Sequence, residues 1–540
     1  GKVDASNAGD MLTQRMLGLL PVLIHGKAGD VCIIGLGSGV TLGSALSSGV
    51  VRHADVVEIS PEVVEASHFF DRENGKALAR PEVRLIVGDG RSHLLLTSQR
   101  YDVIVSEPSN PWMAGVASLF TQQFFEAARA RLKPNGLLCQ WAHTYDISFR
   151  DLQSIVGTFA SVFPQGTLWM VGGGDLLLIG SRDGEILPRL AAVESGAQKG
   201  TVGPTLSDVG IATGTASFAL LSQFAGGPDE LARYGAGALI QTDDHTPLEY
   251  SAPRGIYGRS REDNAATIRR LATARPPAVR RAFDKATAAD WTSRGQMDLR
   301  AQAFGPAYES FGRAVALDSR SAAALSGLSD AAGGVGRLDE ERQRLREIAS
   351  REPANTPVLI ELSRVLAVTG DVQGALDAAS TALRISPGEP RAAEQLASVL
   401  ADAGDGERLM PLADAMIERF PDRPDARYYR ATALFLRGDA RAAVTAAREV
   451  LVARPDHARA QSLLGAACAA LGQRDCALAA FGAAIRDSPR DPSGYVNAGI
   501  LSLQSGNPAA AIEYFASALT IDPSSKAARD GLAQARSPKF

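Results

Sequence analysis

The first half of the chain alternates short apolar runs with stretches in which apolar residues recur every three or four positions. The runs have the length and β-branched content of strands, and they cover 30–40, 53–60, 83–90, 101–108 and 137–143. Helical spacing covers 119–133, and Ser60-Pro61-Glu62 supplies an N-cap, a first-turn proline and a first-turn acid for another helix. Strands that alternate with helices predict an α/β domain with a parallel sheet and helices on both faces.

The second half follows a fixed period of 34 residues. Prolines recur at 353, 387, 421, 455, 489 and 523, and glycines at 336, 370, 404, 438, 472 and 506. Small residues keep the same phase, at Ala307, Ala375, Ala443, Ala477 and Ala511. A 34-residue period with small residues at helix crossings, glycine at the turn and proline at the repeat end resembles the tetratricopeptide repeat (TPR) family.

This resemblance implies seven helical hairpins over 288–525, followed by a short capping helix and a tail at 526–540. The rest of the domain plan is an α/β domain at 1–260 and a charged helical connector at 261–287. Stacked hairpins bury a common core and form an all-α solenoid. Its concave face is expected to bind a peptide or a protein, and a spacer or self-association role is the alternative.

The composition of the chain argues against several classes of partner and site. The net charge of −4, the pI of about 6.1 and the lack of any basic block with interleaved aromatics argue against a nucleic-acid partner. The cysteines, which form no CxxC pair, are expected to be reduced, buried thiols of a reducing compartment; they are Cys32, Cys139, Cys468 and Cys476. No spacing of His, Asp and Glu fits a metal site. No apolar run reaches the roughly 18 residues of a membrane span.

Polar clusters follow four of the predicted strands directly. In open parallel sheets, ligands bind beyond the carboxyl ends of the strands. The clusters are Gly35–Gly39, Glu58, Asp89-Gly90 and Glu107–Asn110. We therefore expect them to converge on one crevice.

The first three clusters suggest a nucleoside site. Gly35, Gly37 and Gly39 spell GxGxG around Ser38, but the dinucleotide fingerprint would require glycine where this chain has Val40. Glu58 lies 19 residues after Gly39 and could accept hydrogen bonds from both ribose hydroxyls.

Asp89, beside Gly90, could bind an adenine amino group. There is no Walker lysine for phosphates, so an adenosyl sulfonium such as S-adenosylmethionine fits better than NAD or ATP. The alternative is that Glu58 and Asp89 are merely exposed acids at strand ends.

Six stretches, in order over about 1–180, resemble the spermidine synthase-like (polyamine aminopropyltransferase) family. They are DMLTQRMLGLLP (10–21), VCIIGLGSG, VVEIS, VGDG, YDVIVSEPSNP and SLFTQQFF. The resemblance implies a Rossmann-like, class I methyltransferase-type domain. It also implies that an aminopropyl group passes from decarboxylated S-adenosylmethionine to an amine such as putrescine.

The resemblance also implies roles for single residues. Gln14 matches the donor-binding glutamine, Glu58 the ribose acid and Asp89 the adenine acid. Glu107 falls where the family has the aspartate that accepts a hydrogen bond from the attacking amine.

The departures from the family lie mainly on the acceptor side. Asn110 replaces a second acid, Ser38 replaces an aspartate, and Thr13 is found near Gln14 where the family has a catalytic tyrosine. Losing carboxylates that face a dication could cost about 2–5 kcal/mol of binding. Ser38 also removes a repulsion against a donor that carries a carboxylate, so intact S-adenosylmethionine becomes a plausible donor.

An acidic stretch at 241–254 could compensate for the lost charge. It contains Asp243, Asp244 and Glu249. If it folds back over the crevice it supplies acceptor-binding carboxylates, and otherwise it is an exposed turn that closes the domain. The stretch resembles the end of long spermidine synthase-like proteins that occur next to membrane-spanning segments.

The sequence thus predicts a transferase that acts on a small amine without a metal. Glu107 would accept a hydrogen bond from the nucleophile or act as a weak base, Asn110 would orient it, and Trp112 would wall the pocket. The alternatives are an S-adenosylmethionine-dependent methyltransferase on the same scaffold and a catalytically degenerate TPR scaffold. A cytoplasmic location is expected. The chain begins at Gly1 inside a patterned segment, as a fragment would, so an upstream membrane anchor absent from this chain is compatible with it.

Overall fold

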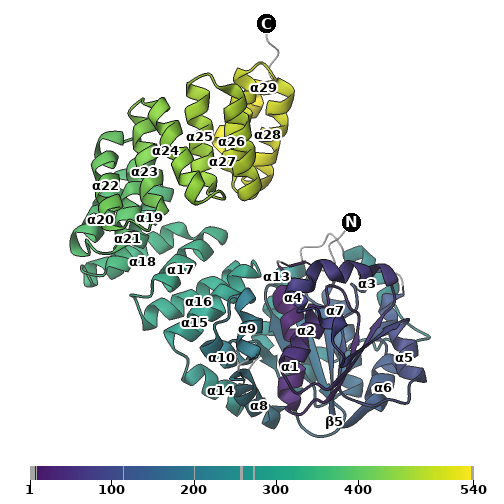
Figure 1. The fold of residues 1–540 in the computed structure, drawn as a ribbon. Coiled ribbons are helices and arrows are strands. Elements are labelled where there is room, and N and C mark those ends of the chain that lie inside the picture. The colour runs from purple at the N-terminus through teal and green to yellow at the C-terminus, as the bar shows by residue number, and fades with distance from the viewer. Residues whose placement is uncertain are drawn as a thin grey trace. The chain divides into compact units, whose positions relative to one another are not determined.

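A computed structural model describes residues 6–7, 9–113, 115–199, 201–255, 260–271, 274–523 and 525–536. Contacts divide the chain into two compact units, Gly1–Arg337 and Leu338–Phe540. The first unit contains the sheet, and the second consists of helices (Figure 1). Within the described residues, no helix is both long enough and apolar enough to cross a membrane.

The first unit is built on an eight-stranded sheet with the order β3-β2-β1-β4-β5-β7-β6-β8. The strands are β1 Asp30–Ile34, β2 His53–Glu58, β3 Val83–Val87, β4 Tyr101–Ser106, β5 Leu132–His143, β6 Thr167–Val171, β7 Asp175–Ser181 and β8 Phe224–Gly226. Strands β1 to β5 are parallel, and the pairs β5–β7, β7–β6 and β6–β8 are antiparallel.

The five strands expected from the apolar runs are therefore confirmed, but the expectation of a purely parallel sheet was incomplete. β6 and β7 form a hairpin across Gly172-Gly173-Gly174, and β8 pairs with β6. The sequence analysis assigned no strands to these segments, although a glycine run between two apolar runs is a hairpin signal.

Helices cover both faces of the sheet (Figure 1). They are α1 Met11–His25, α2 Val40–Ser47, α3 Pro61–Ser67, α4 Asp71–Asn74, α5 Gly90–Leu96, α6 Gln122–Arg131, α7 Phe149–Val162, α8 Ala191–Ala197, α9 Val202–Leu206, α10 Ala216–Leu221, α11 Pro228–Gly235, α12 Leu248–Ser251, α13 Ser260–Leu271 and α14 Pro277–Asp284. Short 3₁₀ turns are η1 His68–Phe70, η2 Ala77–Ala79, η3 Val116–Phe120, η4 Leu187–Leu190, η5 Ser207–Val209, η6 Thr213–Thr215 and η7 Ala252–Gly255.

Alternate residues of the central strands enter two different cores, because successive side chains of a strand point to opposite faces. Val103, Val105 and Trp141 pack in the core that contains α1 and α2. Ile104 and Leu138 pack in the core that contains α6 and α7. Burial on both faces explains why these strands appear as continuous apolar runs in the sequence.

A buried arginine fixes α1 against α2. Arg15 donates to the Ser44 hydroxyl at 3.1 Å, to the Glu73 carbonyl at 2.9 Å and to the Asp208 carboxylate at 2.6 Å. Only 5% of its surface is exposed, so these partners compensate for the desolvation of its charge. The first turn of α1 is thereby held beside the glycine turn that precedes α2.

In the described part of the chain, seven pairs of consecutive helices follow, one pair for each 34-residue period; the second pair is consecutive in sequence only, because the two compact units divide between its helices. They pair α15 Ala288–Arg300 with α16 Phe304–Leu317, α17 Ala322–Gly334 with α18 Leu338–Arg351, α19 Thr356–Val368 with α20 Val372–Ile385, α21 Pro390–Asp402 with α22 Gly406–Arg419, α23 Pro424–Leu436 with α24 Ala440–Ala453, α25 Ala458–Ala470 with α26 Arg474–Asp487, and α27 Pro492–Gln504 with α28 Pro508–Ile521. The capping helix is α29 Lys526–Arg536. The phased glycines all have positive φ, from 71° to 87°, because each occupies the left-handed turn within a hairpin.

The first hairpin belongs to the same compact unit as the sheet, which ends at Arg337 rather than before the repeats. Trp291 of α15 packs edge-on against Phe218 and Phe283, with ring centroids 4.9 Å and 5.6 Å apart. The repeat array therefore begins as part of the core of the α/β unit.

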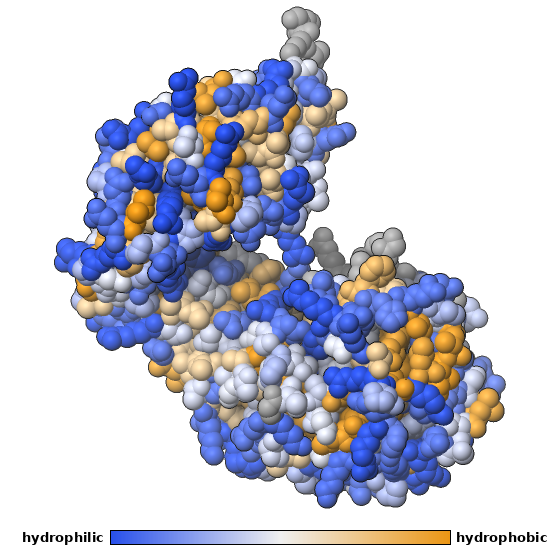
Figure 2. Space-filling model, viewed as in Figure 1, coloured by the Kyte–Doolittle hydropathy of each residue, from blue (hydrophilic) through white to orange (hydrophobic). Residues whose placement is uncertain are grey.

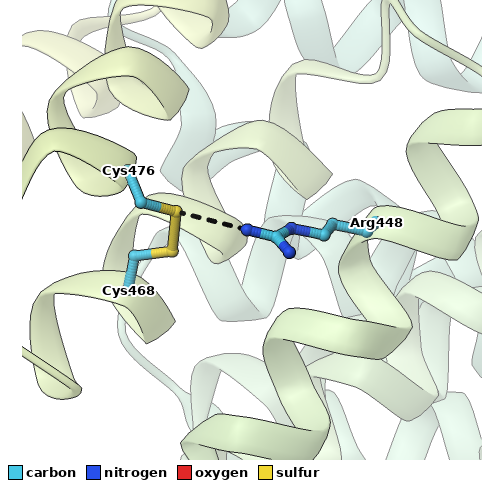
Figure 3. The surroundings of a disulfide bond; sticks show 3 residues. All are labelled: Arg448, Cys468 and Cys476. Atoms are coloured by element: carbon cyan, nitrogen blue, oxygen red, sulfur yellow. Dashed lines mark hydrogen bonds between the residues drawn. A yellow bond between two sulfur atoms is a disulfide. The ribbon is translucent and has the colours of Figure 1, made fainter. Parts of the chain in front are cut away.

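A disulfide joins the two helices of the sixth hairpin. Cys468 on α25 and Cys476 on α26 are bonded, and the guanidinium of Arg448 lies 3.9 Å from the sulfur of Cys476 (Figure 3). The expectation of four reduced thiols was wrong for this pair, because a spacing of eight residues carries no signature until the helices are folded side by side. Cys32 and Cys139 are free and buried, as expected.

The edge strand β3 exposes apolar side chains. Leu85 and Val87 of β3 are exposed, as are Ile59 after β2 and Phe69 of η1. Figure 2 shows apolar residues gathered on the surface near α3 and α5.

Removing the disulfide should destabilise the second unit. Closing an eight-residue loop is worth about 2–3 kcal/mol in the chain-entropy description. We expect the Cys468→Ser, Cys476→Ser double variant to lose about this much free energy of unfolding in urea titrations. Dithiothreitol should destabilise the native chain equally and leave the double variant unchanged. An effect of reductant on both proteins would contradict the assignment.

Candidate functional site

The predicted polar clusters lie at the carboxyl ends of β1, β2, β3 and β4, which are neighbours in the sheet. Gly35 follows β1, Glu58 ends β2, Asp89 follows β3 and Glu107 follows β4. The topology therefore brings the four clusters to one edge of the sheet, as the sequence predicted.

The glycine turn after β1 touches the loop after β4. Gly35 has φ of 91°, and a Cβ there would lie 2.4 Å from the carbonyl oxygen of Glu107. The Glu107 amide in turn donates to the Ile34 carbonyl at 2.9 Å. Gly90 is similarly constrained, because its Cβ would lie 2.3 Å from Ile34. Gly37 and Gly39 complete the turn with φ of 51° and 75°.

Glu58 stabilises that turn from the neighbouring strand. Its carboxylate accepts from the Leu36 amide at 2.8 Å and from the Ser60 amide at 2.9 Å. The side chain is only 6% exposed. Each oxygen retains a lone pair, so the carboxylate could also accept from the hydroxyls of a ribose.

Asp89 is exposed and caps α5, because its side chain accepts from the Ser92 amide at 2.7 Å. Gly90 beside it is buried. The second oxygen of Asp89 can accept a donor such as an adenine amino group.

The first turn of α1 meets the glycine turn through three polar side chains. Gln14 donates to the Asp10 carboxylate at 2.7 Å and accepts from the Ser38 hydroxyl. Gln14 and Ser38 are both buried. Ser38 therefore contacts Gln14 instead of contributing a charge to the site.

Glu107 is the carboxyl group whose titration the site changes most. Its carboxylate accepts from the Thr41 hydroxyl of α2 at 2.6 Å. Desolvation raises the pKa of Glu107 to about 8, and repulsion by Asp10 and Asp175 adds to the rise while the Thr41 bond opposes it. A carboxyl group with this pKa can exchange a proton near neutral pH.

The loop after β4 carries the other predicted acceptor residues. Asn110 is 3% exposed, and within the described residues its Oδ1 has no hydrogen-bond partner. Trp112 packs edge-on against His143 at the end of β5, with ring centroids 5.0 Å apart. The ring of Tyr145 stacks on His143 at 4.6 Å. Trp112 thus belongs to an aromatic cluster at the carboxyl end of β5.

Two of the three acids at 243–249 are already engaged with the protein itself. Asp243 forms an ion pair with Arg91 of α5, and Glu249 accepts from the Gly115 amide at 3.0 Å. Asp244 is exposed. The segment lies along the loop after β4, since the Gln122 amide donates to the Gln241 carbonyl at 2.8 Å.

Sequence reasoning missed Asp10, Thr41 and Asp175. Asp175 begins β7 and accepts from the Thr13 hydroxyl at 2.5 Å and from the indole of Trp141 at 3.2 Å. Two signals were available: Asp10 lies one helical turn before Gln14, and Asp175 follows a run of three glycines. In the described part of the chain, no group of three His, Cys, Asp or Glu side chains is arranged to hold a metal ion.

Two parts of the chain match known protein families. Residues 10–190 match the spermine/spermidine synthase domain. Residues 394–458 and 464–526 match the tetratricopeptide repeat. Both resemblances read from the sequence are therefore confirmed over these ranges.

Curated relatives of the synthase-like domain are polyamine aminopropyltransferases. Polyamine aminopropyltransferase 2 of Pseudomonas aeruginosa is 31% identical over 172 residues, which are 31% of this chain and 48% of the relative. The enzyme of Pseudomonas syringae pv. tomato is 29% identical over 164 residues, 30% of this chain and 57% of the relative. The chain thus spans about half the length of these relatives.

Solved structures resemble each half separately. Spermidine synthase from Thermotoga maritima is 23% identical, with a TM-score of 0.30, over 34% of this chain and 63% of that protein. A tetratricopeptide repeat protein from Parabacteroides merdae is 16% identical, with a TM-score of 0.39, over 46% of this chain and 99% of that protein.

The pKa of Glu107 predicts how stability changes with pH. The folded chain keeps this proton up to about pH 8, whereas the unfolded chain releases it near the ordinary value of 4.5. Because the folded state binds more protons between these values, the contribution of Glu107 to stability is lost as pH rises through that window. We expect Glu107→Gln to gain stability relative to the native chain between pH 5 and pH 9.

Urea unfolding at several pH values measures this difference. Glu65→Gln, at an exposed glutamate, is the matched control and should differ from the native chain by a constant amount. A Glu107→Gln difference that does not vary with pH would contradict the raised pKa.

Proposed function

We propose that the α/β unit transfers an aminopropyl or related alkyl group from an S-adenosyl sulfonium donor to an amine. The observation that carries the proposal is the contact between the glycine turn at Gly35 and the backbone of Glu107. The backbone of Glu107, which would be the acid of the acceptor side, lies against the turn that would face the donor. The similarity of residues 10–190 to polyamine aminopropyltransferases supports the same reaction.

The donor substrate would be S-adenosylmethionine or its decarboxylated form. Glu58 would accept the ribose hydroxyls and Asp89 the adenine amino group, while Gln14 would contact the part of the donor near sulfur. The glycine turn, Gly35 to Gly39 with Ser38, would pass close beneath the nucleoside, and Gly90 would leave room for it.

The chemistry is an in-line displacement. The lone pair of the amine nitrogen attacks the carbon bonded to the sulfonium, the carbon–sulfur bond breaks, and its electron pair stays on a neutral thioether. Glu107 takes the proton that the new C–N bond makes acidic. Positioning supplies most of the acceleration because the leaving group is already good. Asn110 would orient the amine, and Trp112 would exclude water.

The second candidate is methyl transfer from intact S-adenosylmethionine. Ser38 favours it, because the hydroxyl is spent on Gln14 and adds no charge that would repel the donor's carboxylate. The choice of donor therefore separates the two reactions.

The repeats would contribute a protein-interaction surface. We propose that the concave face of the array binds a peptide or protein ligand, as stacked helical hairpins commonly do. We also propose a cytoplasmic location. The Cys468–Cys476 disulfide argues against it, because disulfides persist mainly in oxidising compartments.

Restoring a negative charge at position 38 tests the donor site. In Ser38→Asp, we expect affinity for intact S-adenosylmethionine to fall at least about tenfold relative to the decarboxylated form. Calorimetric titration with each donor measures the ratio. Ser38→Asn is the uncharged control and should leave the ratio unchanged. An unaltered ratio in Ser38→Asp would place the donor's carboxylate elsewhere.

The Glu107→Gln variant tests the proposed role of Glu107 as the base that takes the proton of the attacking amine. We expect transfer to putrescine to fall about 10²–10⁴-fold, the usual contribution of a general base. Donor affinity should stay within about twofold, since the amide occupies the same volume and one charge at a distance has a small effect. Turnover equal to that of the native chain would remove Glu107 from the reaction.

A further inference from the structure

The disulfide of the sixth hairpin joins two unlike cysteines. Cys468 is completely buried in the last turn of α25, whereas Cys476 is partly exposed in the first turn of α26. A thiolate that approaches from solvent therefore meets the sulfur of Cys476 first. Because the rate of thiol–disulfide exchange depends on which sulfur is accessible, exchange at this bond is directed to Cys476.

The surroundings of Cys476 favour a thiolate at its sulfur. The guanidinium of Arg448, on helix α24 of the preceding hairpin, lies 3.9 Å from that sulfur and points toward it (Figure 3). Cys476 is also the third residue of a 14-residue helix, where the first amides carry partial positive charge. A neighbouring guanidinium and a helix N-terminus are the surroundings in which cysteines act as nucleophiles and as leaving groups.

The start of α26 differs from that of the equivalent helices α20, α22, α24 and α28. In each of those helices an Asp or Asn side chain at the N-cap accepts a hydrogen bond from the amide three residues later. These caps are Asp371, Asp405, Asp439 and Asn507. The cap of α26 is Gln473, whose side chain makes no such bond in the described part of the chain. The amide left without a side-chain cap is that of Cys476 itself, which keeps the positive end of the helix beside the sulfur.

We propose that Cys468 and Cys476 form a redox-active pair that exchanges with dithiols, in which Cys476 forms the mixed disulfide and Cys468 is the resolving cysteine. The pair lies in the repeats, so this inference goes beyond the proposed transfer reaction and does not depend on it. The substrate is a dithiol that is oxidised to a disulfide, and the reduced pair carries out the reverse reaction on a disulfide.

The exchange is balanced between the pair and its dithiol. One thiolate of the dithiol attacks the sulfur of Cys476, the bond to Cys468 breaks, and Cys468 leaves with the electron pair and takes a proton from water. The second thiolate of the dithiol then attacks the first sulfur of the dithiol, and the bond from that sulfur to Cys476 breaks. Cys476 leaves as a thiolate that Arg448 stabilises. Two electrons pass from the dithiol to the cysteine pair, so no other oxidant is needed.

The competing role for this bond is a purely structural disulfide, which a reductant reaches only when the hairpin opens. Urea separates the two roles, because it promotes opening in proportion to the surface that unfolding exposes. We expect dithiothreitol to reduce the oxidised full chain equally fast with and without about 1 M urea. Reduction that requires unfolding would accelerate at least about fivefold at this urea concentration, and such an acceleration would overturn the inference.

Two single variants of the full chain identify the sulfur that reacts. Cys468→Ser leaves Cys476 as a free thiol, and Cys476→Ser leaves Cys468. We expect iodoacetamide to alkylate Cys476 at least about tenfold faster than Cys468, with circular dichroism showing that both variants are folded. Mass spectrometry of the peptides assigns each site, and the buried thiols Cys32 and Cys139 serve as slow internal references. Equal rates at Cys476 and Cys468 would overturn the inference.

Arg448→Gln, made in the Cys468→Ser chain, tests the stabilisation of the thiolate. We expect alkylation of Cys476 at neutral pH to slow at least about threefold, because less of the thiol is ionised. Arg441→Gln, at an exposed arginine of the same helix α24, is the matched control and should leave the rate unchanged. Equal rates in the two arginine variants would overturn the role assigned to Arg448.

The last measurement tests dithiol oxidation directly. The oxidised full chain is mixed with dithiothreitol and, separately, with a model peptide that contains two cysteines. We expect each dithiol to become a disulfide as the chain gains two thiols, and glutathione, a monothiol, to be trapped on Cys476. Oxidation of dithiothreitol alone would restrict the substrate to small dithiols. Oxidation of neither dithiol, or glutathione trapped on Cys468, would overturn the inference.

Discussion

The absence of a side chain at Gly35 allows the backbones that follow β1 and β4 to touch. Any Cβ there would collide with the carbonyl of Glu107, and the positive φ excludes most other residues independently. Glu58 then holds the turn through the Leu36 amide, and Gln14 holds it through the Ser38 hydroxyl. The polar residues at the carboxyl ends of β1, β2 and β4 are therefore arranged around a backbone contact, and their positions relative to each other depend on it.

The features that the sequence predicted correctly are those that depend on neighbouring residues alone. The N-cap at Ser60 is present as predicted, with its side chain accepting from the Val63 amide. The phased glycines of the repeats occupy the left-handed turns that their spacing implied. In both cases a short pattern specifies the backbone directly, so no knowledge of distant contacts was needed.

The features that the sequence did not predict depend on contacts between residues that are far apart along the chain. Asp175 comes near enough to act on Glu107 only because β7 returns antiparallel beside β5, and its partner Thr13 is 162 residues away. Asp243 looked available as an acceptor acid, but Arg91, which is 152 residues distant, neutralises it. The disulfide is a shorter-range case, since only the folded hairpin brings its cysteines together. Counting charges along the sequence therefore could not show which acids already have a partner in the folded chain.

The hydrogen bond between Gln14 and Asp10 joins a residue proposed to contact the donor to an acid whose charge acts on Glu107. A ligand that reorients the amide on one side necessarily disturbs the carboxylate on the other. Thermodynamic linkage makes such an effect reciprocal: whatever factor one substrate applies to the affinity of the second, the second applies to the first. In the proposed transferase, the start of α1 would thus be a route by which binding of one substrate changes the affinity for the other.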